Sequence, residues 1–116
     1  MTNNGSMKMS YLRSKFKDEV LFARIMQDIS TSDDDFHKEE IRLVKEFVET
    51  RRINQEDYQN LKQFSNDEVI EAISSSFLKG KENLIIKLIQ ADGKVAKSEE
   101  SILRKCQNRM NDNKAY

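Results

Sequence analysis

Two acidic pairs with the same internal spacing are the residues of this sequence best suited to chemistry. Asp33 precedes Glu40 by seven positions, Asp92 precedes Glu99 by seven, and the two pairs are 59 residues apart. Carboxylate oxygens are the ligands that Ca²⁺, Mg²⁺ and Mn²⁺ prefer in proteins. We therefore predict Asp33, Glu40, Asp92 and Glu99 as ligands of a divalent cation. Because few carboxylates converge, we expect weak binding, with a dissociation constant on the order of 10⁻⁴–10⁻³ M.

The repetition extends beyond the acidic residues to the apolar positions around them. At the same offset of 59 residues, four apolar positions are matched by apolar positions: Ile29 with Leu88, Phe36 with Val95, Leu43 with Ile102, and Val44 with Leu103. An apolar helix, an aspartate at its end and a glutamate that opens the next helix thus occur twice. The pattern predicts two helix-turn-helix halves related by a pseudo-twofold axis.

The acidic turns differ from an EF-hand in the residues that precede them. If Asp92 is aligned with the fifth loop position, Leu88 and Gln90 stand where the first two oxygen ligands belong. In the first copy Ile29 and Thr31 occupy those places. Without these carboxylates the six or more oxygen ligands of an EF-hand cannot be assembled.

A second interpretation of the acidic residues is purely structural. An aspartate at a helix end faces the negative end of the macrodipole, an unfavourable arrangement that a bound cation would offset. Alternatively, Asp92 accepts hydrogen bonds from amides of the turn that follows it, and Glu99 lies in the first turn of the next helix, where the dipole favours it. The sequence leaves both interpretations open.

The second acidic turn carries a family resemblance. Residues 88–103 read LIQADGKVAKSEESIL, which resembles the turn characteristic of TerB-like (tellurite-resistance-associated) domains, and the resemblance extends over about residues 20–110. In the first half Ser32-Asp33-Asp34 replaces Ala91-Asp92-Gly93. The resemblance implies an all-helical, cytoplasmic, stress-related module of bacteria or phages. It also implies acidic, cation-binding turns, assembly into larger complexes, and no established catalytic activity.

The elements that position these turns are predicted to be helices throughout. The 116 residues contain no proline and three glycines, and apolar residues recur at helical spacing, with no alternation of period two. We predict an all-α, compact bundle of about six or seven helices. Residues 1–10 are predicted as a flexible N-terminal arm and residues 11–116 as a single helical TerB-like domain. One helix is expected from Leu12 to about Ser30, and another from Val69 to Gly80.

Composition excludes several classes of function. Twenty basic and twenty acidic residues cancel, which argues against nucleic acid as a partner. A single cysteine and a single histidine exclude a disulfide framework and a Cys/His zinc centre. We expect Cys106 in the core, His37 at an exposed helix cap, and no nucleophile at Ser74-Ser75-Ser76. The predicted protein is therefore not an enzyme, and the lack of a long apolar run predicts a cytoplasmic location.

Two alternatives to the acidic-turn hypothesis remain at the sequence level. In the first, the chain is a protein–protein interaction domain whose acidic residues are only caps, with an unknown partner and oligomeric state. In the second, the N-terminal helix attaches the protein to an anionic membrane surface, because residues 1–17 carry a net charge of +4.

Overall fold

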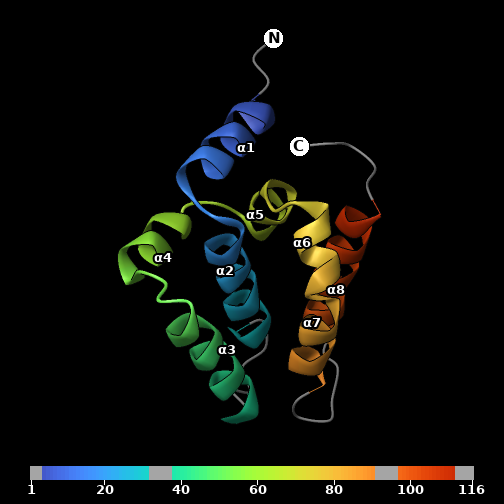
Figure 1. Cartoon of the computed structure of the whole chain (residues 1–116). Coiled ribbons are helices and arrows are strands. Elements are labelled where there is room, and N and C mark those ends of the chain that lie inside the picture. The colour runs from blue at the N-terminus through green and yellow to red at the C-terminus, as the bar shows by residue number, and fades with distance from the viewer. Residues whose placement is uncertain (1–3, 32–37, 91–96, 112–116) are drawn as a thin grey trace.

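The fold is an all-α bundle, as the sequence predicts (Figure 1). The computed structural model describes residues 4–31, 38–90 and 97–111, and within them the chain forms eight helices and no strand. The helices are α1 (Asn4–Lys15), α2 (Asp18–Thr31), α3 (Lys38–Thr50), α4 (Gln55–Leu61), α5 (Asn66–Ala72), α6 (Ser75–Gly80), α7 (Glu82–Ile89) and α8 (Lys97–Met110). None of the described helices is long and apolar enough for a membrane span.

The N-terminal region differs from the prediction in two respects. Residues 4–10 belong to α1, so helix begins at Asn4 rather than after a ten-residue arm. The single helix predicted from Leu12 to Ser30 is also wrong, because the chain breaks after α1 and α2 begins at Asp18. The break lets α1 lie against α5 while Leu12 of α1 and Phe16, which follows α1, enter the core, with exposed fractions of 0 % and 6 %.

Helix α2 is the centre of the bundle. It contacts α3, α4, α5, α7 and α8, and half of its residues are buried. The ring of Phe22 lies 5.4 Å from that of Phe47 on α3 and 5.8 Å from that of Phe77 on α6. Fully burying one side chain of this size contributes about 1.5–3 kcal/mol, so α2 supplies much of the apolar stabilisation.

The internal repeat predicted from the sequence appears in the helices. Helix α3 begins at Lys38 and α8 at Lys97, an offset of 59 residues, and α2 precedes α3 as α7 precedes α8. Buried positions recur at the same offset: Met26 and Ile85, Ile29 and Leu88, Leu43 and Ile102, Phe47 and Cys106.

The contacts between the two helical hairpins follow the same symmetry. Helix α2 contacts α7, α2 contacts α8, and α3 contacts α7. Exchanging the two halves maps the α2–α7 contact onto itself and the α2–α8 contact onto the α3–α7 contact. In Figure 1 both α2 and α7 end, and both α3 and α8 begin, at the lower end of the molecule. An approximate twofold axis between the hairpins accounts for this arrangement.

Three short helices, α4, α5 and α6, connect the two hairpins. A capping box begins α5: the Ser65 amide donates to Glu68 at 2.8 Å, and the Glu68 amide donates to Ser65 Oγ at 3.2 Å. Asn54 is the N-cap of α4, and its side chain accepts from the Glu56 amide at 2.8 Å. These local bonds fix where α4 and α5 begin.

The single helix predicted from Val69 to Gly80 is wrong, because it is divided into α5 and α6. Ile73 has extended backbone angles (φ −78°, ψ 139°), and Ser74 is the N-cap of α6. Asp18 of α2 holds the break by accepting from the Ser74 amide at 3.2 Å and from its hydroxyl at 2.9 Å. Arg13 donates to the Ala72 carbonyl at 2.6 Å, and Arg109 donates to the Ile73 carbonyl at 3.0 Å.

Candidate functional site

Two of the four predicted cation ligands lie in the described part of the chain. Glu40 is the third residue of α3 and Glu99 the third residue of α8. Their exposed fractions are 2 % and 1 %, unlike most carboxylates, which stay at the surface. Asp33 and Asp92, the other two predicted ligands, lie outside the described residues, as does His37.

The position of the two glutamates explains part of their burial. A carboxylate in the first turn of a helix is favoured by the macrodipole by about 0.3–1 kcal/mol. The third helical position also lets a glutamate reach back toward the backbone that enters the helix. Glu40 and Glu99 therefore lie where each can organise the turn between the two helices of its hairpin.

Burial of Glu40 and Glu99 is compatible both with a structural cap and with a ligand of an enclosed cation. The two interpretations differ in one measurable respect, because only the second makes stability depend on a divalent ion. The described residues alone contain no group of three or more His, Cys, Asp or Glu side chains able to hold a metal. The predicted site thus depends on the aspartates of the turns as well as on the glutamates.

A polar cleft of about 370 Å³ lies between the end of α2, the start of α5 and the start of α8. Thr31 and Ser98, which line it, are close in sequence to the two predicted acidic turns. Its remaining lining residues are Arg24, Asp28, Asn66, Ser101, Ile102 and Lys105. Lys105 forms an ion pair with Asp67 at 2.8 Å, which fixes α8 against α5 at the edge of the cleft.

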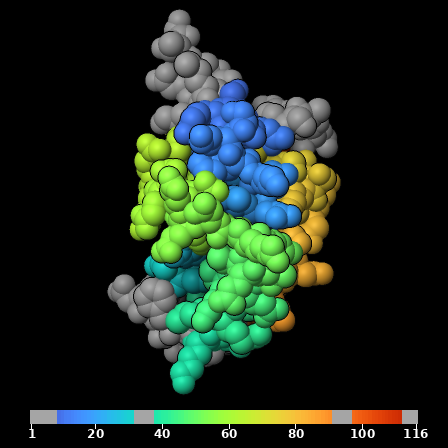
Figure 2. All heavy atoms as spheres, turned by 60° about the vertical axis from the view of Figure 1, so that its left-hand side comes forward, coloured from blue at the N-terminus to red at the C-terminus, as the bar shows by residue number. Residues whose placement is uncertain are grey.

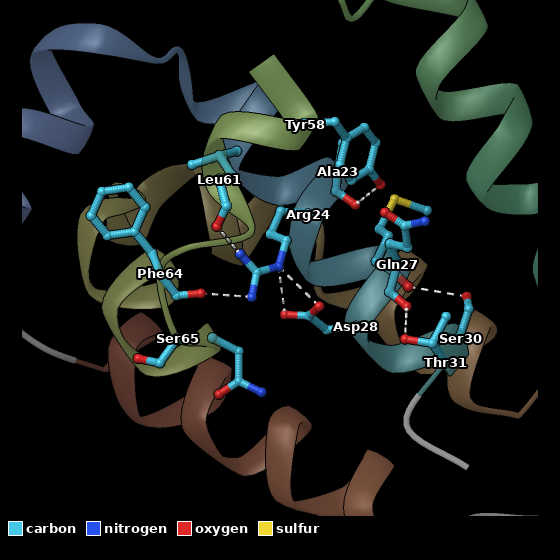
Figure 3. A network of polar contacts seen from close by, with 12 residues as sticks. Ala23, Arg24, Gln27, Asp28, Ser30, Thr31, Tyr58, Leu61, Phe64 and Ser65 are labelled. Carbon is cyan, nitrogen blue, oxygen red and sulfur yellow. Dashed lines mark hydrogen bonds and ion pairs between the residues drawn. The ribbon is translucent and has the colours of Figure 1, made fainter. Parts of the chain in front are cut away.

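Arg24 organises the polar network beside this cleft (Figure 3). Its Nε donates to both carboxylate oxygens of Asp28, at 3.0 and 3.1 Å. Its Nη1 donates to the Leu61 carbonyl, and its Nη2 donates to the Phe64 carbonyl at 2.8 Å. One guanidinium thus binds the carbonyl of Leu61, the last residue of α4, which also accepts from the Phe64 amide at 3.1 Å, and the carbonyl of Phe64, which follows α4. The i,i+4 spacing of Arg24 and Asp28 signals the ion pair in the sequence, whereas the carbonyl partners have no sequence signal.

Burial governs the ionisation of the groups around Arg24. It raises the pKa of Asp28, and the hydrogen bond and charge of Arg24 oppose that rise. Burial also raises the pKa of Tyr58 well above its usual value, with the Asp28 charge adding to the effect. The neutral Tyr58 hydroxyl donates to the Ala23 carbonyl at 2.7 Å (Figure 3). The network is therefore a structural clamp between α2 and α4.

The other residues singled out in the sequence have structural positions. Cys106 is fully buried, as predicted, and burial raises its pKa to about 12, so it is a protonated thiol rather than a nucleophile at neutral pH. Ser74 caps α6 and contacts Asp18.

Comparisons of the chain with protein-family models, with curated proteins and with solved structures found no match.

Proposed function

We propose that this protein is a non-enzymatic, TerB-like helical module whose twin acidic turns bind a divalent cation or a basic partner. The observation that carries the proposal is the internal repeat, in which α3 and α8 each open with a buried glutamate at the same helical position. By the resemblance of its second turn, the module is stress-related and cytoplasmic.

The arrangement of the two hairpins supports a paired site rather than two unrelated turns. Helices α3 and α8 begin at the same end of the molecule (Figure 1). Asp33, Glu40, Asp92 and Glu99 would place four carboxylates at that end, a charge that attracts Ca²⁺, Mg²⁺ or Mn²⁺. The same charge would attract a lysine- or arginine-rich segment of a protein partner.

The main alternative is a protein–protein interaction domain in which the acidic residues are caps only. The position of Glu40 and Glu99 in the first turn of their helices, where a glutamate can reach back to the backbone, supports it. Membrane attachment through α1 has less support, because Leu12 and Phe16 are buried in the core and are not available to lipid.

Calorimetric titration and thermal unfolding with Ca²⁺, Mg²⁺, Mn²⁺ and Zn²⁺ test the cation proposal. At an ion concentration ten to a hundred times the dissociation constant, we expect stabilisation by about 1.4–2.7 kcal/mol. Asp92→Asn and Glu99→Gln should abolish the ion-dependent shift. The matched control Glu71→Gln, at an exposed position on α5, should retain it.

The same experiment separates the two interpretations. If no ion produces heat or a shift in melting temperature, the cation proposal is wrong. If Asp92→Asn lowers stability equally with and without ions, the acidic residues are caps.

A further inference from the structure

A basic cleft lies where two interhelical connections meet. It has a volume of about 280 Å³ and is formed by residues 15–20, around the α1–α2 junction, and residues 51–57, around the α3–α4 junction. Figure 2 shows this face, where the N-terminal residues in blue adjoin green residues of α3 and α4. The residues that line this basic cleft include four cationic and two apolar ones: Lys15, Lys17, Arg51, Arg52, Phe16 and Ile53.

The charges of the basic cleft are unbalanced. Four cationic side chains line it, against only Glu19 and Asp57, which gives a local charge of +2 in a chain whose net charge is zero. Within the described part of the chain, Lys15, Lys17, Arg51 and Arg52 form no ion pair with an acidic side chain.

Arg52 has a backbone conformation that glycine usually occupies. Its φ of 52° is the only positive value of a non-glycine residue in the described ranges. The Arg52 amide donates to the Glu49 carbonyl at 3.2 Å, and the Ile53 amide donates to the Val48 carbonyl at 3.0 Å, the pattern of a Schellman motif. An arginine there adds steric strain that glycine would avoid, and such strain is typical of functional positions.

The neighbouring Arg51 is oriented by an aromatic ring. Its guanidinium carbon lies 3.9 Å from the ring centre of Phe47, a cation–π contact that holds the planar group without using its N–H donors. Phe16, Val20 and Ile53 add apolar surface to the same cleft. The cleft therefore combines a charged rim with an apolar wall.

We propose that the basic cleft binds the phosphate group of a small phosphorylated ligand. A phosphate monoester carries a charge of about −1.5 to −2 at neutral pH, which complements the local charge of +2. Guanidinium and ammonium groups are the side chains that recognise phosphate oxygens, arginine through two parallel hydrogen bonds. The inference is independent of the proposed function. The basic cleft lies at the start of α2 and the end of α3, about 20 Å along these helices from the acidic turns.

The test is a titration of the ¹⁵N-labelled protein with inorganic phosphate and with pyrophosphate at constant ionic strength. We expect saturable shifts of amide resonances in residues 15–20 and 51–57. Arg52→Gly and Lys17→Gln should each weaken binding about two- to fivefold, and the double variant by the product of the two factors. Lys79→Gln, which removes an exposed charge from α6, should leave the affinity unchanged.

Arg52→Gly also separates a binding defect from a folding defect. Because glycine relieves the strain at this position, its melting temperature should rise while its affinity for phosphate falls. Phosphate binding equal to that of the unmodified chain would overturn the proposal.

Two further arms identify the source of the phosphate. Equal shifts with chloride at the same ionic strength would show that the cleft binds anions without preference for phosphate and would overturn the proposal. Binding to phosphatidylserine vesicles without any response to free phosphate would assign the cleft to a membrane surface and would also overturn it.

Discussion

Arg24 joins α2 to the end of α4 and the residues that follow it through several hydrogen bonds of one guanidinium. Its guanidinium contacts Asp28 within α2 and the Leu61 and Phe64 carbonyls at the end of α4. Removing it would leave the half-buried Asp28 carboxylate and the Phe64 carbonyl without these donors, whereas the Leu61 carbonyl would keep the hydrogen bond from the Phe64 amide. The cost of such a loss exceeds that of losing an exposed ion pair.

We therefore predict that Arg24→Met lowers the free energy of unfolding by about 2–3 kcal/mol. Arg42→Met is the matched control, because Arg42 is 54 % exposed and forms surface ion pairs with Glu39 and Glu46. The control should change stability by less than about 1 kcal/mol. Denaturant unfolding of both variants measures the difference, and similar losses in the two would contradict the assigned role of Arg24.

The elevated pKa of Asp28 predicts a specific pH dependence. Its carboxyl binds a proton more readily in the folded state than in the unfolded state, because burial raises its pKa. The protonated Asp28 therefore stabilises the folded state, and this contribution to the free energy of unfolding is fully present below the unfolded pKa of about 3.9. The contribution is lost as pH rises through the folded pKa, whereas Asp28→Asn has no such pH dependence. Unfolding of both proteins from about pH 3 to about pH 7 measures this difference. If the stability of the unmodified protein relative to Asp28→Asn instead increased with pH, the raised pKa of Asp28 would be contradicted.

The thiol of Cys106 should be unreactive toward thiol reagents in the folded protein. It is fully buried, so a reagent cannot reach the sulfur, and its pKa is raised to about 12, so little thiolate is present at neutral pH. We predict that an aromatic disulfide reagent reacts with it at the rate of global unfolding and at once in denaturant. Rapid, stoichiometric reaction under native conditions would show that this face of α8 opens locally.

At the scale of elements, the break between α5 and α6 depends on a contact across 56 residues. Asp18 accepts from both the amide and the hydroxyl of Ser74. We predict a coupling energy of about 0.5–3 kcal/mol in a double-mutant cycle of Asp18→Ala and Ser74→Ala, measured by denaturant unfolding. Additive effects of the two substitutions would show that the break forms without Asp18.

This contact also shows why some elements could be predicted and others could not. The caps at Asn54 and Ser65 depend on residues two or three positions away, so the sequence alone indicates them. The breaks before Asp18 and at Ile73 interrupt continuous apolar stripes. They depend on partners from distant parts of the chain, which periodicity does not reveal.

At the scale of the whole molecule, the 59-residue repeat was readable because it preserves both helix starts and buried positions. It predicted the paired hairpins and the equivalent placement of Glu40 and Glu99. The polar cleft beside Arg24 and the basic cleft were not predicted. The polar cleft is assembled from three helices and the basic cleft from two interhelical connections, and no single segment carries a motif for either.

The two ends of the α2–α3 hairpin differ in charge. The first predicted acidic turn follows α2, whereas the basic cleft lies at the beginning of α2 and at the end of α3. Opposite charges at opposite ends of one small domain allow two ligands of opposite charge to bind without direct competition.

The central proposal is that both acidic turns contribute to one cation site, and paramagnetic Mn²⁺ tests it most directly. In ¹⁵N-labelled protein with substoichiometric Mn²⁺, we predict that amide resonances at the starts of α3 and α8 (residues 38–40 and 97–99) broaden together. Excess Ca²⁺ or Mg²⁺ should restore both sets in parallel. Broadening at only one of the two helix starts, or at neither, would contradict the account.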